Sequence, residues 1–417
     1  MNLSDSRPRK VARSSSFLLI PLLILILIAG SAGYYIYFYR EPQPTKSETT
    51  NLIITQTPIP TPTPDPIPKT LRLNALWFGI VFWGRYVNDW SMASPLKEAY
   101  PFSGLSTLEK EKYNAWIATL DCPITDKIID SRTMDSNLLF NCTPNYLPEV
   151  QKWFDAFGLA NSHTANMEGL KGFDTTRKNL DSYGIQYFGH YDKKFTDQIC
   201  EVMSFDTFEE YGDPDYAPKK EYKMPIAVCG YHNTFSLATE EQLNVITEYS
   251  KYFPTFVMGN QGTEYNTTPD NLQRQAFRKM LDKGGDVLVG ISAHVVQSTE
   301  SYNGKLIFYS MGNFIFDQQD GETVRSGAAL NTDLTFVFDE NLEKYTILAE
   351  ECTLYPDTCL TKASELRLIK PKFKIKYDLI PTDNSGKLAK KADPKIRDIV
   401  WKRANWEQTV TQLSSEL

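Results

Sequence analysis

Four short segments carry most of the polar side chains that could do chemistry in this 417-residue chain. Each follows an apolar run with the composition of a buried strand, and they cover residues 161–167, 260–265, 292–297 and 312–318. Their ionisable side chains include two imidazoles, His163 and His294, and the carboxylate of Glu264, and Asp121 stands earlier in the chain. Three or four nitrogen and oxygen ligands suffice to hold zinc or manganese. Imidazoles and carboxylates are groups of this kind, so a ligand or metal role depends on whether folding brings them together.

Each of these side chains also has a purely structural interpretation. The chain has 4 histidines, which limits any histidine-rich metal centre. His163 is either a binding or acid group or a hydrogen-bonded loop histidine, and His294 is either a ligand or a buried, satisfied histidine. Glu264 either faces the site or pairs with a cation such as Arg85, and Asp121 either faces the site or caps a turn.

Alternating strand-like and helix-like segments must position these groups. Short apolar runs predict buried strands at residues 74–83, 154–163, 224–233, 255–260, 286–292 and 305–316. Amphipathic runs predict helices at residues 106–119, 167–183, 239–251 and 269–283. Thr268 is the expected N-cap of the last helix. This alternation predicts an α/β domain in which helices cover a largely parallel or mixed sheet, with its functional loops at the carboxyl ends of the strands.

The remainder of the chain predicts a different local pattern. Residues 328–381 read as antiparallel strands, one of them at 344–351, and residues 394–417 read as a terminal helix.

The hydrophobic fraction of 41% and the charged fraction of 23% are those of a globular protein. The formal net charge of −7 leaves no strong basic field, so we expect no nucleic-acid partner.

The first seventy residues predict a membrane tether. Residues 17–39 contain no charge and are long enough to cross a bilayer as a helix, and residues 1–16 are rich in arginine and lysine. This predicts a cytoplasmic head at 1–16, a signal-anchor helix at 17–39 and a single-pass cell-membrane protein. A proline- and threonine-rich spacer at 40–69 then leads to an extracytoplasmic domain at 70–417. A cleaved signal peptide, cut near residues 29–31, is the alternative.

All six cysteines lie beyond the apolar run, at Cys122, Cys142, Cys200, Cys229, Cys352 and Cys359. An even number of cysteines in an extracytoplasmic domain is typical of disulfides. Pairing of neighbours (122–142, 200–229, 352–359) is the simplest connectivity, and buried free thiols are the alternative.

Several motifs occur in an order and spacing that resemble one known family. The strongest are Gly312-Asn313-Phe314-Ile315-Phe316-Asp317 and His294-Val295-Val296-Gln297, and segments 158–189 and 260–265 add to them. Together they resemble the CapA-type capsule synthesis family, whose members serve poly-γ-glutamate production, over about residues 73–330. The resemblance implies a metallophosphatase-like fold, a four-layer α/β arrangement in which a β-sandwich is flanked by helices.

The resemblance also shows where this chain departs from the family. Four positions at which the family pattern places metal ligands hold other residues: Ile80, Ser162, Asn260 and Ser292. Isoleucine binds no cation, and serine and asparagine are neutral oxygen donors that compensate no cation charge. A two-metal phosphoesterase needs carboxylates and imidazoles to hold two cations about 3.5–4 Å apart. The chain is therefore not expected to be an active two-metal enzyme.

Three functions remain open on the sequence. The first is a membrane-anchored module that binds, exports or helps to assemble an anionic surface polymer, with polymer-synthesis proteins as further partners. Its expected ligand-binding cleft holds Arg85, Asp121, Asn161, Ser162, Asn260, Glu264, Ser292, His294 and Asn313. The second is a hydrolase with one manganese or zinc ion at Asp121, His163, Glu264 and His294, with His163 as the candidate catalytic residue. The third is a purely structural surface module.

Overall fold

The computed structural model describes residues 68–212, 221–234 and 236–416. They belong to one compact unit that extends from Pro64 to Leu417. The predicted head at 1–16, the predicted anchor at 17–39 and nearly all of the predicted spacer at 40–69 lie outside the described residues. Within the described part of the chain, no helix is long and apolar enough to span a membrane.

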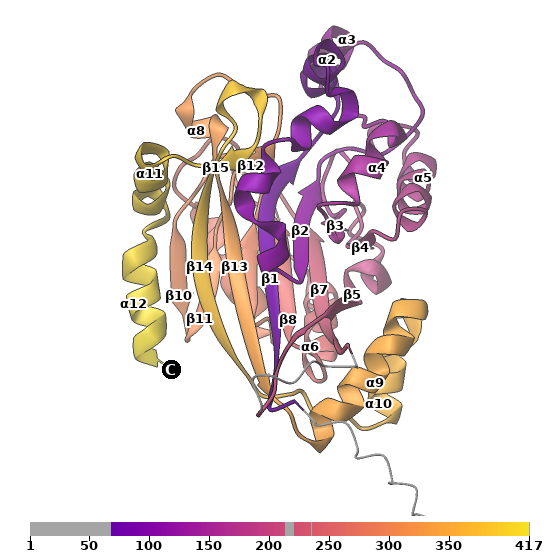
Figure 1. Ribbon diagram of the computed structural model, residues 1–417, viewed down its shortest axis with the longest axis vertical. Helices are drawn as coiled ribbons and strands as arrows, with labels where there is room; N and C mark the ends of the chain where they lie inside the picture. The colour runs from indigo at the N-terminus through magenta and orange to yellow at the C-terminus, as the bar shows by residue number, and fades with distance from the viewer. Residues whose placement is uncertain (1–67, 213–220, 235, 417) are drawn as a thin grey trace, which may run out of the picture. The chain divides into compact units, whose positions relative to one another are not determined.

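Two sheets form the centre of the fold (Figure 1). The first sheet runs in the order β15-β14-β13-β1-β2-β3-β4, and β6 and β12 also pair with β1. Its strands are β1 (Thr70–Val81), β2 (Ala115–Leu120), β3 (Ala156–Gly158), β4 (Gln186–Phe188), β6 (Phe208–Glu210), β12 (Asn313–Ile315), β13 (Ser326–Val337), β14 (Phe373–Asp383) and β15 (Lys390–Lys391). Strands β1 to β4 and β12 are parallel, whereas β13, β14 and β15 pair antiparallel.

The second sheet runs in the order β10-β11-β9-β8-β7-β5. Its strands are β5 (Cys200–Asp206), β7 (Lys223–His232), β8 (Thr255–Asn260), β9 (Val287–Gly290), β10 (Thr299–Tyr302) and β11 (Lys305–Phe308). Strands β7, β8, β9 and β11 are parallel, and the edge strands β5 and β10 are antiparallel to their neighbours. The carboxyl ends of the parallel strands in each sheet therefore lie along one edge of that sheet.

Side chains of the two sheets meet in one core. The ring of Trp77 in β1 stacks on that of Phe256 in β8 at 4.7 Å between centroids. The hydroxyl of Thr119 in β2 contacts the sulfur of Met258 in β8 at 2.8 Å. These contacts pack β1 and β2 against β8, and residues at or just after the carboxyl ends of β1, β2, β8 and β9 line the candidate site.

Helices cover the sheets. The helices are α2 (Arg85–Ala93), α3 (Ser131–Ser136), α4 (Leu147–Val150), α5 (Leu170–Asp181), α6 (Glu240–Ser250), α7 (Asn271–Asp282), α8 (Glu322–Arg325), α9 (Glu340–Leu354), α10 (Cys359–Glu365), α11 (Pro394–Ala404) and α12 (Trp406–Glu416). Helices α6 and α7 bury their apolar sides against the second sheet, where Phe277 stacks on Tyr309. Helix α11 packs on β14, and α12 packs on β10 (Figure 1). The mixed α/β prediction is thus confirmed.

Several local predictions were wrong. The run at 305–316, expected as one strand, forms β11 and β12 in different sheets, and the expected terminal helix at 394–417 is divided at Asn405 into α11 and α12. Residues 344–351, expected as a strand, lie in α9, because buried residues recur there with a helical period from Leu342 to Cys352, and Asp339 caps the start. Residues 106–119, expected as a helix, form short 3₁₀ turns and then β2. Helix α7 is capped by Asp270, whose carboxylate accepts from the N–H of Gln273 at 2.8 Å, and not by Thr268.

The cysteines pair as the simplest connectivity predicted. The disulfides are Cys122–Cys142, Cys200–Cys229 and Cys352–Cys359, and no described cysteine is free. The second bridge joins the registered pair Cys200 and Cys229 on neighbouring strands β5 and β7. The first bridge lies directly after β2 and therefore next to Asp121.

Candidate functional site

A narrow cleft lies where strand ends of the two sheets meet, and it gathers most of the residues expected from the sequence. Its cavity has a volume of about 30 Å³, close to the volume that one water molecule occupies in the liquid. The residues that line it are Ile80, Thr119, Asp121, Asn161, Ser162, His163, Thr234, Asn260, Glu264, Ile291, Ser292 and His294. Arg85 and Asn313 were also expected in the cleft, but they do not line it.

Close approach of two strands positions one wall of the cleft. Ile80 in β1 is in register with Asn313 in β12. A Cβ atom at Gly79 would lie 1.9 Å from the carbonyl oxygen of Gly312, so the two strands can approach in this way only with glycine at position 79. Gly79 and Gly312 thus have a packing role. The apolar side chain of Ile80, the residue after Gly79, faces the cleft.

Both histidines in the cleft are oriented by an amide. The Nδ1 atom of His163 lies 2.9 Å from Oδ1 of Asn166, which also accepts from the N–H of Phe140. The Nδ1 atom of His294 lies 2.8 Å from Oδ1 of Asn313, whose Nδ2 donates elsewhere. Each amide oxygen is an acceptor, so each imidazole carries its proton on Nδ1 and keeps Nε2 as an acceptor.

The backbone of His294 is strained at this point. Its φ of 57° lies in the left-handed region, which a non-glycine residue adopts at a cost of about 1–3 kcal/mol. A hydrogen-bonded network holds it there. Asn313 donates to Gln318 at 2.9 Å, Gln318 donates to the hydroxyl of Tyr265 at 2.6 Å, and the Tyr265 ring stacks on that of His294. Such strain is concentrated at functional sites.

Some expected ligand groups are used inside the protein. Asn161 donates to the carbonyl of Leu120 at 2.6 Å, and its Oδ1 accepts from the N–H groups of His163 and Thr164. Ser292 donates its hydroxyl proton to the carbonyl of Gly262 at 2.9 Å. These side chains shape the loops of the cleft. The expected donors that remain for a ligand are the side chains of Ser162 and Asn260.

Arg85 does not point into the cleft, contrary to expectation. Its guanidinium makes two hydrogen bonds of 2.8 Å to Asp317 and lies 4.4 Å from the ring centroid of Phe140. The Phe140 ring contacts His163 on the cleft side, and Phe316 contacts His294 in the same way. Aromatic rings therefore stand between Arg85 and the two imidazoles. Burial raises the pKa of Asp317, and the guanidinium of Arg85 opposes that rise.

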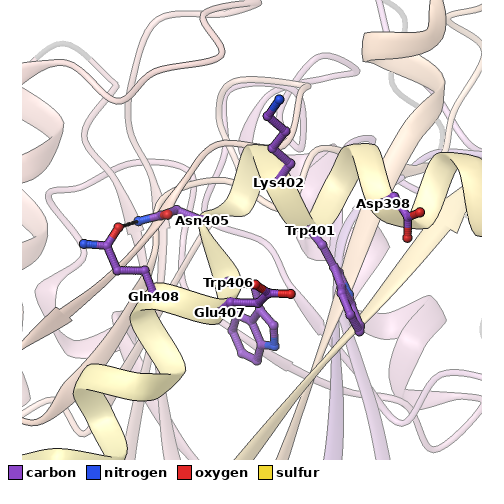
Figure 2. Close-up of a pocket in the computed structure, with 7 residues that line it drawn as sticks. All are labelled: Asp398, Trp401, Lys402, Asn405, Trp406, Glu407 and Gln408. Atoms are coloured by element: carbon purple, nitrogen blue, oxygen red, sulfur yellow. Dashed lines mark hydrogen bonds between the residues drawn. The ribbon is translucent and has the colours of Figure 1, made fainter.

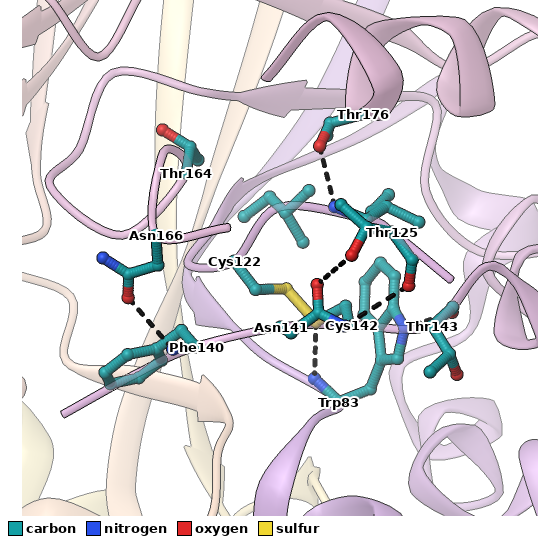
Figure 3. Close-up of a disulfide and its surroundings, with 12 residues drawn as sticks. Trp83, Cys122, Thr125, Phe140, Asn141, Cys142, Thr143, Thr164, Asn166 and Thr176 are labelled. Atoms are coloured by element: carbon teal, nitrogen blue, oxygen red, sulfur yellow. Dashed lines mark hydrogen bonds between the residues drawn. A yellow bond between two sulfur atoms is a disulfide. The ribbon is translucent and has the colours of Figure 1, made fainter. Parts of the chain in front are cut away.

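A disulfide supports the loop of His163 (Figure 3). Cys142 accepts a hydrogen bond from the N–H of Trp83, and its neighbour Asn141 accepts from the hydroxyl of Thr125 at 2.7 Å. Phe140, two residues before Cys142, donates its N–H to Asn166, as Figure 3 shows. The Cys122–Cys142 bridge thus fixes the segment that orients His163 through Asn166.

The residues present do not fit a two-metal centre. Ile80 and Ile291 line the cleft with apolar atoms, and Oδ2 of Asp121, buried without a hydrogen-bond partner, is a single open acceptor and does not make a second metal site. Among residues 68–212, 221–234 and 236–416, no group of three or more His, Cys, Asp or Glu side chains is arranged to hold a metal ion. Asp121, His163, Glu264 and His294 therefore line one cleft without forming a ligand group.

The structure adds a wider pocket that the sequence motifs did not indicate. It has a volume of about 630 Å³ and shares Ser162, Thr234 and Glu264 with the cleft. Its other residues are Tyr191, Asp192, Lys193, His232, Asn233 and Ser236. Its place in the sequence could have revealed it. The loop that begins at Asn233 directly follows β7, just as each motif loop directly follows a strand. Thr119 and Ile291 were likewise missed, because Thr119 ends the expected helix at 106–119 and Ile291 lies inside the predicted strand at 286–292.

Another hollow, of about 380 Å³, lies where α11 meets α12 (Figure 2). Asn405, at the turn between these helices, donates to Gln408 at 2.9 Å, and Trp401 donates to the carbonyl of Leu379 at 3.3 Å. These polar groups are satisfied by the chain itself. The hollow shares no residue with the cleft or the wider pocket, so we place the candidate site at the strand ends.

Comparisons with known proteins agree on one family. A family model described as "Bacterial capsule synthesis protein PGA_cap" matches residues 76–209 and 218–318, which is more than half of the chain. The chain is 32% identical over 174 residues to the PGA biosynthesis protein CapA of Bacillus subtilis (strain 168), covering 40% of this chain and 43% of that protein. It is 46% identical over 57 residues to the capsule biosynthesis protein CapA of Bacillus anthracis, 14% of each chain. The matches span less than half the length of either relative.

Proposed function

The chain belongs to the bacterial capsule synthesis family, and from this premise we propose that it serves the production of an anionic surface polymer by binding that polymer. The Bacillus relatives are named for PGA biosynthesis and capsule biosynthesis, which supports a polymer of the poly-γ-glutamate type. In this proposal the two sheets and their covering helices are the four-layer, metallophosphatase-like arrangement of the family. The cleft has become a binding site and no longer performs hydrolysis.

One observation carries the proposal: the cleft presents hydrogen-bonding groups that, among the described residues, make up no metal-ligand group. A γ-linked glutamate chain offers amide N–H donors, carbonyl acceptors and carboxylates. The Nε2 atoms of His163 and His294 accept from the amide N–H groups, and the side chains of Asn260 and Ser162 donate to the oxygens. The apolar wall at Ile80 excludes water, which strengthens each of these hydrogen bonds.

The proposal places the domain outside the cell. Residues 17–39 form a single-pass anchor, residues 40–69 form a spacer, and the domain at 70–417 faces the exterior. The three disulfides support this location, because disulfides persist in oxidising compartments. Protease added to intact cells should therefore remove the domain and leave a small anchored fragment. Full protection of the chain would refute this orientation.

Binding by the purified full chain in detergent is the direct test. Labelled poly-γ-glutamate, followed by fluorescence anisotropy in the presence of a chelator, should bind saturably. Asn260→Ala should weaken binding about tenfold or more, because a hydrogen bond to a charged group contributes roughly 1.5–3 kcal/mol. Asn266→Ala is the matched control, since Asn266 lies in the following loop outside the cleft and only its backbone carbonyl accepts a hydrogen bond.

The same purified chain distinguishes the proposal from the two other functions that the sequence left open. Metal-dependent hydrolysis of a phosphodiester or of the polymer, with one tightly held manganese or zinc ion per chain, would replace the proposal with a single-metal hydrolase. No binding of polymer and no turnover would leave a structural module.

A further inference from the structure

The wider pocket beside the cleft contains a buried polar side chain whose hydrogen-bonding capacity is unused. Asn233 follows β7 directly, and 3% of its surface is exposed. Its backbone N–H donates to the carbonyl of Asn260 at 3.2 Å, which ties it to the edge of the cleft. Neither Oδ1 nor Nδ2 of its side chain has a partner in the described chain. An unsatisfied buried amide costs stability, so a ligand that pairs with it would recover that cost.

Two neighbours of Asn233 have hydrogen-bonding capacity for a ligand as well. The ammonium of Lys193 is exposed and donates to the hydroxyl of Ser236 at 3.3 Å, and no ion pair engages it among the described residues. Nδ1 of His232 lies 2.8 Å from the carbonyl of Tyr191, so this nitrogen carries the proton and Nε2 is an acceptor. Burial lowers the pKa of His232, which favours this neutral form.

The remaining charges of the pocket are acidic and lie beside these groups. One carboxylate oxygen of Asp192 accepts from the N–H of Lys194 at 3.1 Å and so shapes the turn. Glu264 is exposed where the pocket meets the cleft. Among the described residues, the pocket thus offers one ammonium without an ion pair, one side-chain amide without a partner and one imidazole acceptor, together with the carboxylates of Asp192 and, toward the cleft, Glu264.

We propose that this pocket binds one repeating unit of the polymer, a carboxylate-bearing secondary amide. Asn233 pairs with the amide, because its side chain offers one donor and one acceptor, and a secondary amide offers the complementary acceptor and donor. Lys193 pairs with the carboxylate of the same unit. The inference rests on the proposed function, and it deepens that function by naming the part of the polymer that is recognised and the residues that recognise it.

The volume and position of the pocket agree with this ligand. About 630 Å³ lies in the range of pockets that hold small organic ligands, whereas the cleft of about 30 Å³ admits single polar groups of a ligand and not a whole repeating unit. The two share Ser162, Thr234 and Glu264. A chain that places one unit in the pocket can therefore extend its next group toward His163 and His294.

Variants of the full chain in detergent test the inference. The probe is a fluorescent oligomer of about ten γ-linked glutamates. The first comparison probe has its carboxylates converted to primary amides, the second is a polyacrylate of equal charge without backbone amides, and the third is a neutral oligosaccharide. Asn233→Leu removes the amide at nearly constant volume. Lys193→Ala removes the cation, and Lys194→Ala is its matched control, because Lys194 is exposed and does not line the pocket.

The expected results combine weaker polymer binding with unchanged or higher stability. Asn233→Leu should weaken oligomer binding tenfold or more while the melting temperature stays equal or rises, since the variant relieves an unsatisfied buried amide. Lys193→Ala should weaken binding of the oligomer and of polyacrylate, whereas Lys194→Ala should leave both unchanged. Wild type should bind the amidated oligomer and the polyacrylate less well than the unmodified oligomer. It should not bind the oligosaccharide.

Other outcomes overturn the inference without touching the proposed function. If Asn233→Leu and Lys193→Ala bind the oligomer as wild type does while Asn260→Ala is weakened, the polymer lies in the cleft alone. A raised melting temperature of Asn233→Leu with unchanged binding would mean that Asn233 holds only water. A lowered melting temperature would make Asn233 structural, and Lys193→Ala would then decide. Binding of the oligosaccharide in place of the oligomer would refute the ligand class. Failure of wild type to bind any polymer would instead refute the proposed function.

Discussion

The buried ion pair between Arg85 and Asp317 allows a quantitative test of the corrected role of Arg85. The guanidinium makes two hydrogen bonds of 2.8 Å to the carboxylate, and Arg85 is 5% exposed. The rings of Phe82, Phe140 and Phe316 lie within 4.4–6.0 Å of the guanidinium carbon. This environment makes the pair part of the fold. Its loss should therefore change stability and leave polymer binding unchanged.

Arg85→Met removes the cation and leaves a buried carboxyl group behind. Breaking a buried pair in this way costs about 3–5 kcal/mol of unfolding free energy. With about 2 cal/mol/K of unfolding entropy per residue, a unit of this size should then melt about 4–7 °C lower at pH 8. Circular dichroism or differential scanning calorimetry of the full chain measures the shift. Polymer affinity at 20 °C, well below the transition, should equal that of wild type.

The loss of stability in Arg85→Met should depend on pH, in a direction set by the pKa of Asp317. Burial raises the pKa of Asp317 and Arg85 opposes that rise, so Arg85→Met should raise this pKa further. A carboxyl group whose pKa is raised in the folded state contributes stability below its unfolded pKa, near 4. That stability is lost as the pH rises through the folded pKa. The deficit of Arg85→Met should therefore be small near pH 4 and full at pH 8.

Two variants control this experiment. Arg85→Met combined with Asp317→Leu should recover most of the stability, because an apolar pair of similar volume often replaces a buried ion pair without net cost. Arg72→Met breaks the pair with Asp333, in which the arginine side chain is 34% exposed, and should cost about 1 kcal/mol or less. Wild-type stability of Arg85→Met at pH 8, or an equal deficit at both pH values, would refute the reasoning. So would a selective loss of polymer binding.

Three further predictions concern the cleft and its support. Replacing both Cys122 and Cys142 by alanine should lower the unfolding free energy by about 3 kcal/mol, as expected for a bridge of sequence separation 20, and a denaturation midpoint equal to that of wild type would contradict it. Asp121→Asn should bind the anionic polymer equally or more tightly by removing a like charge, and weaker binding in the anisotropy assay would show that the carboxylate contributes. Ile80→Asp should produce no phosphodiesterase activity with manganese or zinc, because the other replaced ligand positions, Ser162, Asn260 and Ser292, stay neutral, and it should melt lower because it buries an unpaired carboxylate; metal-dependent turnover would disprove this account.

Much of the fold and of the cleft could be predicted from sequence because both depend on local patterns. Apolar runs ending in polar loops mark the parallel strands, and the carboxyl ends of such strands lie at one edge of a sheet. This reasoning was enough to bring His163, Asn260, Glu264 and His294 to one cleft, and the family resemblance added Asp121. Even cysteine pairing followed from the simplest connectivity.

The roles of individual side chains depended on the tertiary structure, because a residue type does not reveal its partner. Arg85 looked like a ligand for an anion, yet it pairs with Asp317, which lies 232 residues further along the chain. Asn161 and Asn233 have the same side chain, but the first is fully used in shaping its loop and the second is buried without a partner. Hydrogen-bonding capacity is a property of an amide, whereas its use is decided by what the fold places within about 3 Å of it.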